Sequence, residues 1–316
     1  MVLGLAKNLY SSGEGELKMN SDISERLGWC LFICRLAVFI IFSVWGYDKL
    51  VRPDHGVNMM ANYYFVSGVP EALITWFGVA EIVLALLVLL GLFKGLVRGL
   101  FLFLSILAVS VPEVLKGYVT AIVEVPHPTI LFFTGFCLLA CSFAIFFLRD
   151  QDTKFSLGRK NMTSNPELTE DTEKNLGLCL ALCRFGVFIV FFVWTLAKFL
   201  HPEHGVNIMR GHYLIDGVTE AAVTIFGLFE MALCIALILG FYKRFTRGFF
   251  LLISIYSVIT PRVLNGYKIF IFENSEPQIF LFSGFTMLAC AIAIYWLRDY
   301  DTRFSLPKAD RARWGD

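Results

Sequence analysis

The chain has 316 residues, of which 57% are hydrophobic and only 17% are charged, and its formal net charge is +1. A soluble domain is about half apolar and carries roughly a quarter charged residues, so the composition argues against an ordinary soluble protein. The near-zero net charge gives no reason to expect a nucleic-acid partner. The apolar residues form runs of about 20, the length that crosses a hydrocarbon core. We therefore expect an all-α integral membrane protein surrounded by the lipid bilayer.

Eight transmembrane segments are predicted in chain order. Residues 1–26 are too polar for a signal peptide and are expected to form an N-terminal segment, with the first span kept as a membrane anchor. The predicted spans are 27–47, 71–93, 97–115 and 129–148, followed by 176–196, 220–242, 246–264 and 278–297. A polar linker at 158–175 separates two units, 27–157 and 176–306, and residues 307–316 form a tail.

The two units are copies of one another. An offset of 149 residues aligns them without a gap, and charges, prolines and glycines fall in register, which apolar helices do not easily achieve by chance. The matched positions include Arg35 with Arg184, Lys49 with Lys198, Glu81 with Glu230, Arg98 with Arg247, and the run His55-Gly-Val-Asn58 with His204-Gly-Val-Asn207. Because each unit has four spans, the two four-helix repeats are expected to be parallel, related by a pseudo-two-fold axis along the membrane normal.

The distribution of Lys and Arg predicts the orientation. The side that holds both termini and the even-numbered loops carries 18 of them, whereas the other side carries seven. Because basic residues are enriched in cytoplasmic loops, both termini are expected in the cytoplasm, with the protein in a bacterial inner membrane. The five histidines then lie on the outer side: His55, His127, His201, His204 and His212.

All eight cysteines lie in the predicted apolar spans, and no pair has the C-x-x-C spacing. Cys30 and Cys34 are four residues apart, as are Cys137 and Cys141, and Cys179 and Cys183. The preferred interpretation is that they are small packing residues between helices. A thiol redox relay is the alternative.

Charged residues inside the spans form the first candidate site. Arg35 and Glu81 are expected at nearly the same depth on neighbouring antiparallel helices, so an Arg35–Glu81 ion pair is predicted, repeated as Arg184–Glu230. Such pairs could serve a proton path, a quinone headgroup or an anion. They could equally be structural pins between two helices.

The loop after the first span of each repeat is the second candidate. It contains Lys49, His55 and Asn58 in the first copy and Lys198, His204 and Asn207 in the second. Proline here stops the helix. His and Met side chains nearby could bind copper, but their spacing suits a metal site poorly. No metal site is therefore predicted, and a turn followed by a short interfacial helix is favoured.

A third repeated pattern, Leu-Arg-Asp-x-Asp-Thr, follows the fourth span of each unit. It is interpreted as a helix exit that docks on the inner face, and it could also mark a surface for another protein subunit. The copies differ at Asp48 (Ala197), Glu113 (Arg262) and Tyr63 (His212), so one copy could hold a working site. The chain has no nucleotide, haem or catalytic fingerprint.

Each unit resembles the DoxX family of four-span membrane proteins, which is related to DoxD and MauE-type proteins. The resemblance rests on Arg35, the Gly46…Lys49…Pro53 exit, Gly78-x-x-Glu81 and Leu90-Gly91. The second unit repeats it with Arg184, Lys198, Pro202, Gly227, Glu230 and Leu239-Gly240, but has Thr195 in place of Gly46. The resemblance implies a membrane subunit associated with redox chemistry, such as quinone-linked sulfur oxidation or resistance to oxidative stress.

Three functions remain open at this point. The leading hypothesis is a membrane subunit of a redox complex, without catalysis of its own and with quinone as a possible cofactor. The second is a non-catalytic scaffold or assembly subunit that binds other membrane or membrane-associated subunits. The third is a small-solute transporter that uses the interface between the two repeats.

Overall fold

A computed structural model describes residues 2–123, 132–157, 169–273 and 281–305, and these residues form helices and connecting turns without any strand. The expected all-α class is confirmed for this part of the chain. The helices are α1 (Val2–Val51), α2 (Pro53–Tyr63), α3 (Glu71–Leu89), α4 (Lys94–Ser110), α5 (Pro112–Val123), α6 (Gly135–Phe147), α7 (Glu170–Leu200), α8 (Pro202–Gly211), α9 (Glu220–Leu239), α10 (Lys243–Ile259), α11 (Pro261–Glu273), α12 (Gly284–Trp296) and the short 3-10 turn η3 (Arg298–Tyr300).

Within the described residues, four helices are long and apolar enough to cross a membrane: the part of α1 from Asp22 to Val51, α3, α7 and α9. The number rises to six if the bent pairs α4–α5 and α10–α11 each count as one span. Two further apolar helices, Phe132–Phe147 and Leu281–Trp296, are shorter. Each of the eight predicted segments thus contains an apolar helix, which supports an integral membrane protein.

Prolines break two helices that the sequence predicts to be continuous. The third predicted span ran to residue 115, but α4 ends at Ser110 and the chain turns by 47° into α5. A proline disfavours the helical conformation of the residue before it, and Val111, before Pro112, is extended with ψ 142°. The same break, of 48°, separates α10 from α11 at Pro261. Prolines also begin α2 and α8, which confirms the expected short helices after the first span of each unit.

The second half of the chain reproduces the element boundaries of the first. Helices α8 to α12 begin 149 residues after α2 to α6. Non-glycine residues with positive φ also occur in pairs at this spacing: Phe65 and Leu214, Phe93 and Tyr242, Phe155 and Phe304. Such backbone is uncommon for bulky side chains, so its recurrence shows that corresponding segments have the same local structure.

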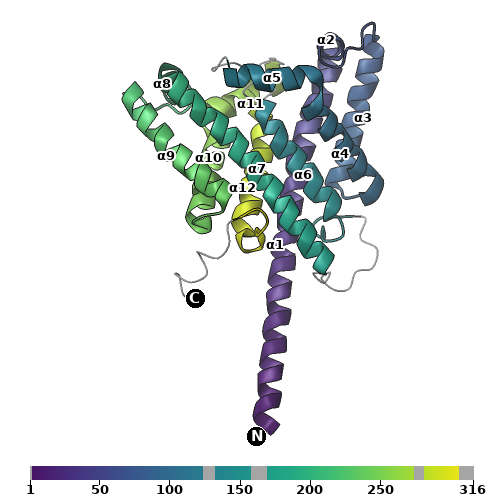
Figure 1. The fold of residues 1–316 in the computed structure, drawn as a ribbon. Coiled ribbons are helices and arrows are strands. Elements are labelled where there is room, and N and C mark those ends of the chain that lie inside the picture. Colours follow the sequence, from purple (N-terminus) through teal and green to yellow (C-terminus); the bar gives the residue numbers. More distant parts are fainter. Residues whose placement is uncertain (1, 124–131, 158–168, 274–280, 306–316) are drawn as a thin grey trace.

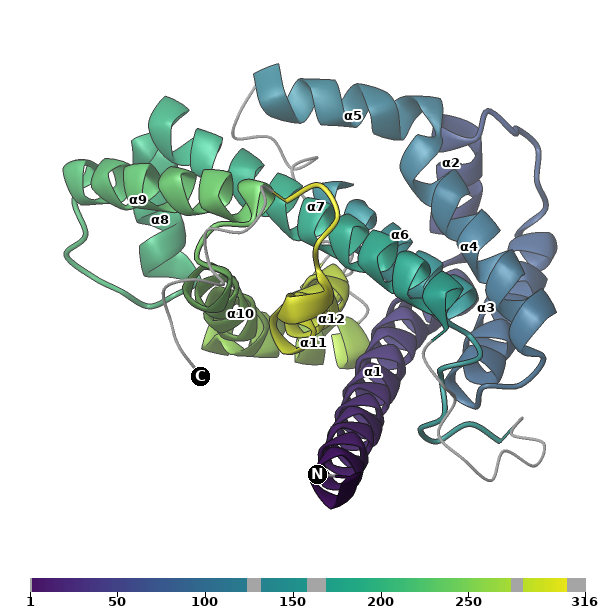
Figure 2. The same ribbon diagram turned by 60° about the horizontal axis from the view of Figure 1, so that its bottom comes forward.

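Helices α1, α6, α7 and α12 pack together in the middle of the molecule (Figures 1 and 2). Helices α3 and α4 lie on one side of this core, and α9 and α10 lie on the other (Figure 2). The short helices α2, α5, α8 and α11 gather at the upper end in Figure 1, whereas α3–α4, α9–α10 and the segments after α6 and α12 turn at the lower end. We call these two ends of the molecule the upper end and the lower end.

Glycines allow α1 and α3 to approach closely. A Cβ atom at Gly46 would lie 2.7 Å from Ile82 Cγ1 and 2.8 Å from the Gly78 carbonyl oxygen, and a Cβ at Gly78 would lie 2.7 Å from the Gly46 oxygen. Backbones that touch in this way need small residues in both helices. The contact sets the register between α1 and α3, on which the candidate site depends.

Replacing Gly46 with leucine is therefore expected to separate α1 from α3. The new side chain would have to occupy space filled by the α3 backbone, which cannot give way as a flexible side chain can. We expect the thermal unfolding temperature in detergent to fall by several degrees, corresponding to a loss of about 1–3 kcal/mol for overpacking. The matched control is Gly95→Ala, because a Cβ at Gly95 meets no atom within 4 Å. A Gly46→Leu protein as stable as the wild type would contradict the close approach.

Candidate functional site

The lower end of the first half contains a buried Arg–Asp–Arg cluster. Arg35 Nε lies 3.0 Å from Asp152 Oδ2, and Arg98 Nη2 contacts the same oxygen. All three side chains are fully enclosed. Each of the two guanidinium groups also donates to a backbone oxygen: Arg35 Nη1 to Leu89 at 2.8 Å and Arg98 Nη1 to Ile145 at 2.9 Å. The cluster joins α1, α4 and the segment after α6.

The second half contains the corresponding cluster. Arg184 Nη1 lies 3.1 Å from Asp301, and Arg247 Nη2 lies 2.6 Å from Asp301 Oδ2. Arg184 also donates to the Arg303 oxygen at 2.7 Å, as Arg35 does to the Lys154 oxygen. The two aspartates belong to the repeated Asp-x-Asp pattern. Both are buried and each pairs with two arginines, so the pattern recurs in both halves because the fold needs this aspartate.

The predicted pairs Arg35–Glu81 and Arg184–Glu230 are wrong. Side chains on a helix point toward its N-terminus. Arg35 therefore points to the lower end, whereas Glu81, on antiparallel α3, points to the upper end. Arg35 bonds the oxygen of Leu89, eight residues and about 12 Å beyond Glu81 along α3. The two charges were expected at one depth, but their side chains diverge.

The partner of each glutamate is a lysine. Lys49 Nζ lies 2.7 Å from Glu81 Oε2, and Lys198 Nζ lies 2.6 Å from Glu230 Oε2. The side chains converge because Lys49 points down α1 while Glu81 points up α3. The glutamates are 7% and 3% exposed and the lysines 19% and 13%, so each pair is enclosed on the carboxylate side and partly open on the ammonium side. Lys49 and Lys198 therefore pair with the glutamates and do not belong to the predicted outer-face site.

An aromatic side chain accompanies each pair. Lys49 Nζ lies 5.4 Å from the centroid of the Phe77 ring, and Lys198 Nζ lies 5.6 Å from that of Phe226.

A tyrosine 149 residues from its counterpart also lies near each carboxylate. Burial, together with the charge of Glu81, raises the pKa of the Tyr64 hydroxyl. In the second half, burial and the charge of Glu230 raise the pKa of Tyr213, although its contact with Ser257 opposes this. We call Lys49, Glu81 and Tyr64, and their counterparts Lys198, Glu230 and Tyr213, the Lys–Glu–Tyr sites. The tyrosines lie past α2 and α8, and only their common offset could have indicated them.

The first half adds a cluster that the second lacks. Asp48 is 6% exposed; its Oδ2 lies 2.7 Å from His55 Nδ1, and its other oxygen contacts Arg52. Asp48 is also close enough to interact electrostatically with Glu81. The second half has Ala197 and His201 at the positions of Asp48 and Arg52. His55, predicted as an outer-face residue, is thereby connected to the Lys–Glu–Tyr site.

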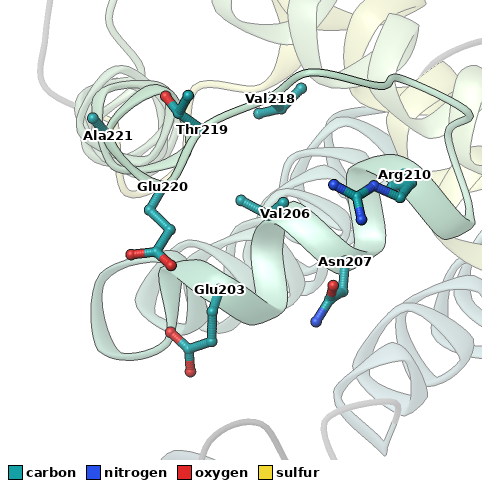
Figure 3. Close-up of a pocket in the computed structure, with 8 residues that line it drawn as sticks. All are labelled: Glu203, Val206, Asn207, Arg210, Val218, Thr219, Glu220 and Ala221. Carbon is teal, nitrogen blue, oxygen red and sulfur yellow. The ribbon is translucent and has the colours of Figure 1, made fainter.

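The other predicted outer-face residues lie apart from this site. Asn58 and Asn207 are exposed, and His204 is half-buried, which lowers its pKa. Asn207 lines an open hollow of about 550 Å³ between α8 and the start of α9 (Figure 3). Glu203, Arg210 and Glu220 also line the hollow, which makes it a polar surface feature. His127 and the side chain of Glu113 fall outside the described residues, among which no metal-binding group of three or more ligands occurs.

Asp152→Asn tests the Arg–Asp–Arg cluster. The change leaves Arg35 and Arg98 enclosed without a counter-charge, and uncompensated buried ions typically cost about 3–5 kcal/mol. We expect a marked fall in unfolding temperature in detergent and lower yield in membranes, with Asp301→Asn behaving alike. Asp150→Asn is the matched control, because Asp150 is exposed in the same turn. Equal stability of the two variants would rule out an ion pair of structural importance.

Comparison with known proteins finds a family match in the first half of the chain. Residues 30–113 match the DoxX family model, and this region extends from α1 to the start of α5. It includes Arg35, Lys49, Glu81 and Arg98. No curated protein and no solved structure matches the chain. The matched region contains the first Lys–Glu–Tyr site and both arginines of the first cluster, so this part of the chain is similar to the DoxX family.

Proposed function

We propose that the chain is a non-catalytic membrane subunit of a redox complex, in which the Lys–Glu–Tyr site of the first half binds a quinone headgroup and exchanges its protons. The proposal rests on an ion pair between two apolar helices, α1 and α3. Its lysine is partly exposed, whereas its glutamate is almost fully enclosed. Ionisable residues at such depth are costly and generally serve function. The Arg–Asp–Arg clusters are completely enclosed and explain the fold, which leaves the lysine–glutamate pairs as the charges available to a ligand.

The donor set suits a quinone. The Lys49 ammonium can donate a hydrogen bond to a carbonyl oxygen, and the Glu81 carboxylate can accept a proton from a hydroxyl group. The Phe77 ring offers an apolar face beside them. A bound quinone would supply the two-electron chemistry, and the protein would orient the headgroup and hold the proton. Tyr64, which is 39% exposed, lies close enough to Glu81 to interact with it electrostatically.

The Asp48–His55 pair favours the first half as the working copy. His55 is 23% exposed and lies in α2 at the upper end, so it can carry a proton between the surface and the enclosed carboxylates. Ala197 removes this connection in the second half, where the Lys198–Glu230 pair would be structural. The match to the family model also lies in the first half.

Quinone binding tests the proposal. Loss of a hydrogen bond to a charged group weakens binding by about 1.5–3 kcal/mol, so Glu81→Gln should raise the dissociation constant of a short-chain ubiquinone at least tenfold. Glu230→Gln should have a smaller effect. The measurement is calorimetric titration of the purified protein, with Glu71→Gln, an exposed change at the start of α3, as the control. Unchanged binding in both Glu81→Gln and Glu230→Gln would sink the quinone assignment.

We further propose that α1, α3, α4, α6, α7, α9, α10 and α12 all cross the membrane as two parallel repeats, with both termini in the cytoplasm of a bacterial cell. The paired positive-φ residues support this arrangement: Phe93, Phe155, Tyr242 and Phe304 are exposed aromatic residues at the lower end, where such residues commonly meet the headgroup layer. Sixteen residues of apolar helix in Phe132–Phe147 span about 24 Å, which suffices with local adjustment of the bilayer.

Epitope insertion distinguishes eight spans from fewer. Tags placed within 124–131 and within 158–168 should be accessible from opposite sides of the membrane, with the second tag on the same side as a tag at either terminus. If α6 does not cross, the two insertions will be labelled from the same side. Tags at the termini alone cannot decide, since four, six and eight spans all return the chain to its starting side.

The remaining alternatives receive unequal support. A scaffold role is favoured by Phe155 and Phe304, which are 67% and 79% exposed beside the lower end and could contact another subunit. A transporter that uses the interface between the halves is disfavoured, because side chains of α6 and α12 meet in van der Waals contact along it, with Cys141 Sγ and Cys290 Sγ 3.6 Å apart.

A further inference from the structure

Cysteines gather where the two halves meet. Cys141 on α6 and Cys290 on α12 face each other with their sulfur atoms 3.6 Å apart, although 149 residues separate them in the chain. Cys34 on α1 lies close enough to Cys141 to interact with it, and Cys183 on α7 is likewise close to Cys290. The sulfur atoms of these residues form a row in the order 34, 141, 290, 183, and Cys137 lies beside Cys290 in this row.

The surroundings orient the central pair. The Cys141 thiol lies 3.7 Å from the Thr286 oxygen of α12, and the Cys290 thiol lies 3.5 Å from the Cys137 oxygen of α6. Each thiol is thus directed across the interface by a carbonyl of the opposite helix. Packing alone would be served by alanine, which already stands beside these cysteines at Ala140 and Ala289. Reciprocal thiol contacts are a more specific arrangement than small volume requires.

We propose that Cys141 and Cys290 form a redox-active dithiol that a peroxide converts to a disulfide joining the two halves. This site is independent of the proposed quinone site. Neither sulfur is accessible to solvent, so a bulky or charged oxidant cannot reach the pair, whereas hydrogen peroxide is neutral and little larger than water. Enclosure therefore selects the class of oxidant.

The reaction balances without another reactant. The Cys141 sulfur attacks one peroxide oxygen, the O–O bond breaks, and a sulfenic acid and one water result. The Cys290 sulfur then attacks the Cys141 sulfur, the S–O bond breaks, and a second water leaves with the thiol proton. Two thiols are oxidised by two electrons, and one peroxide is reduced to two waters. The short distance makes the second step intramolecular, which favours disulfide over further oxidation.

A cleavable linker provides the test. A specific protease site is inserted within residues 158–168 of the full chain, and membranes are treated with hydrogen peroxide, alkylated, solubilised and cut. On a non-reducing gel the oxidised halves should migrate together, and reductant should separate them. Cys141→Ala and Cys290→Ala should each abolish the link. Cys234→Ala should retain it, because Cys234 lies apart from the row, near Glu230.

Mass spectrometry of the wild-type chain can identify the linked cysteines without any substitution. In the oxidised wild-type chain, a peptide containing Cys141 should be joined to one containing Cys290, and the link should raise the unfolding temperature reversibly. The proposal is overturned if the halves separate after peroxide treatment with all eight thiols still free. It is also overturned if both single variants remain linked, since another pair would then be responsible.

Discussion

Each half of this protein holds two arginines and one aspartate inside an apolar helix bundle, and the lower end depends on how these charges are satisfied. One carboxylate cannot neutralise two guanidinium groups. The excess positive charge is met by backbone oxygens near the ends of α3 and α6, where the helix dipole is negative. Arg35 and Arg98 can therefore stay enclosed only while α1, α3, α4 and the segment after α6 keep their places. The ion cluster and the helix packing require one another.

The direction of side chains then separates the charges into two layers. On α1, Arg35 points to the lower end and meets the aspartate, while Lys49, about 21 Å further along the helix, points down to meet Glu81 from antiparallel α3. The close approach at Gly46 and Gly78 holds this register. The arginines are paired with Asp152 and with backbone oxygens at the lower end, so they do not neutralise the lysine–glutamate pair. A structural layer and a chemically available layer therefore coexist in one four-helix unit.

Hydropathy and the 149-residue offset predicted the helices, their order and the proline-terminated first span, because these depend on local sequence. The ion pairs could not be predicted in the same way. A depth measured from predicted span ends does not include the opposite directions in which the Arg35 and Glu81 side chains point. Asp152 lay beyond the fourth predicted span and was assigned to a surface segment. Pro112 stood within the third predicted span, but continuous hydrophobicity outweighed it. Tyr64 carried no local signal, since its role depends on the fold of α2 against α3.

Differences between the two halves separate what the fold requires from what it does not. The Arg–Asp–Arg cluster is present in both, as removal of any member would strand a buried charge. The Lys–Glu pair is also present in both. Asp48 and Arg52 are absent together from the second half, where Ala197 in α7 and His201 at the break before α8 take their positions without loss of the Lys198–Glu230 pair. The fold therefore does not need Asp48. An enclosed carboxylate that the architecture can omit, and that connects the lysine–glutamate pair to His55 at the upper end, is the feature of the first half on which the proposed proton exchange rests.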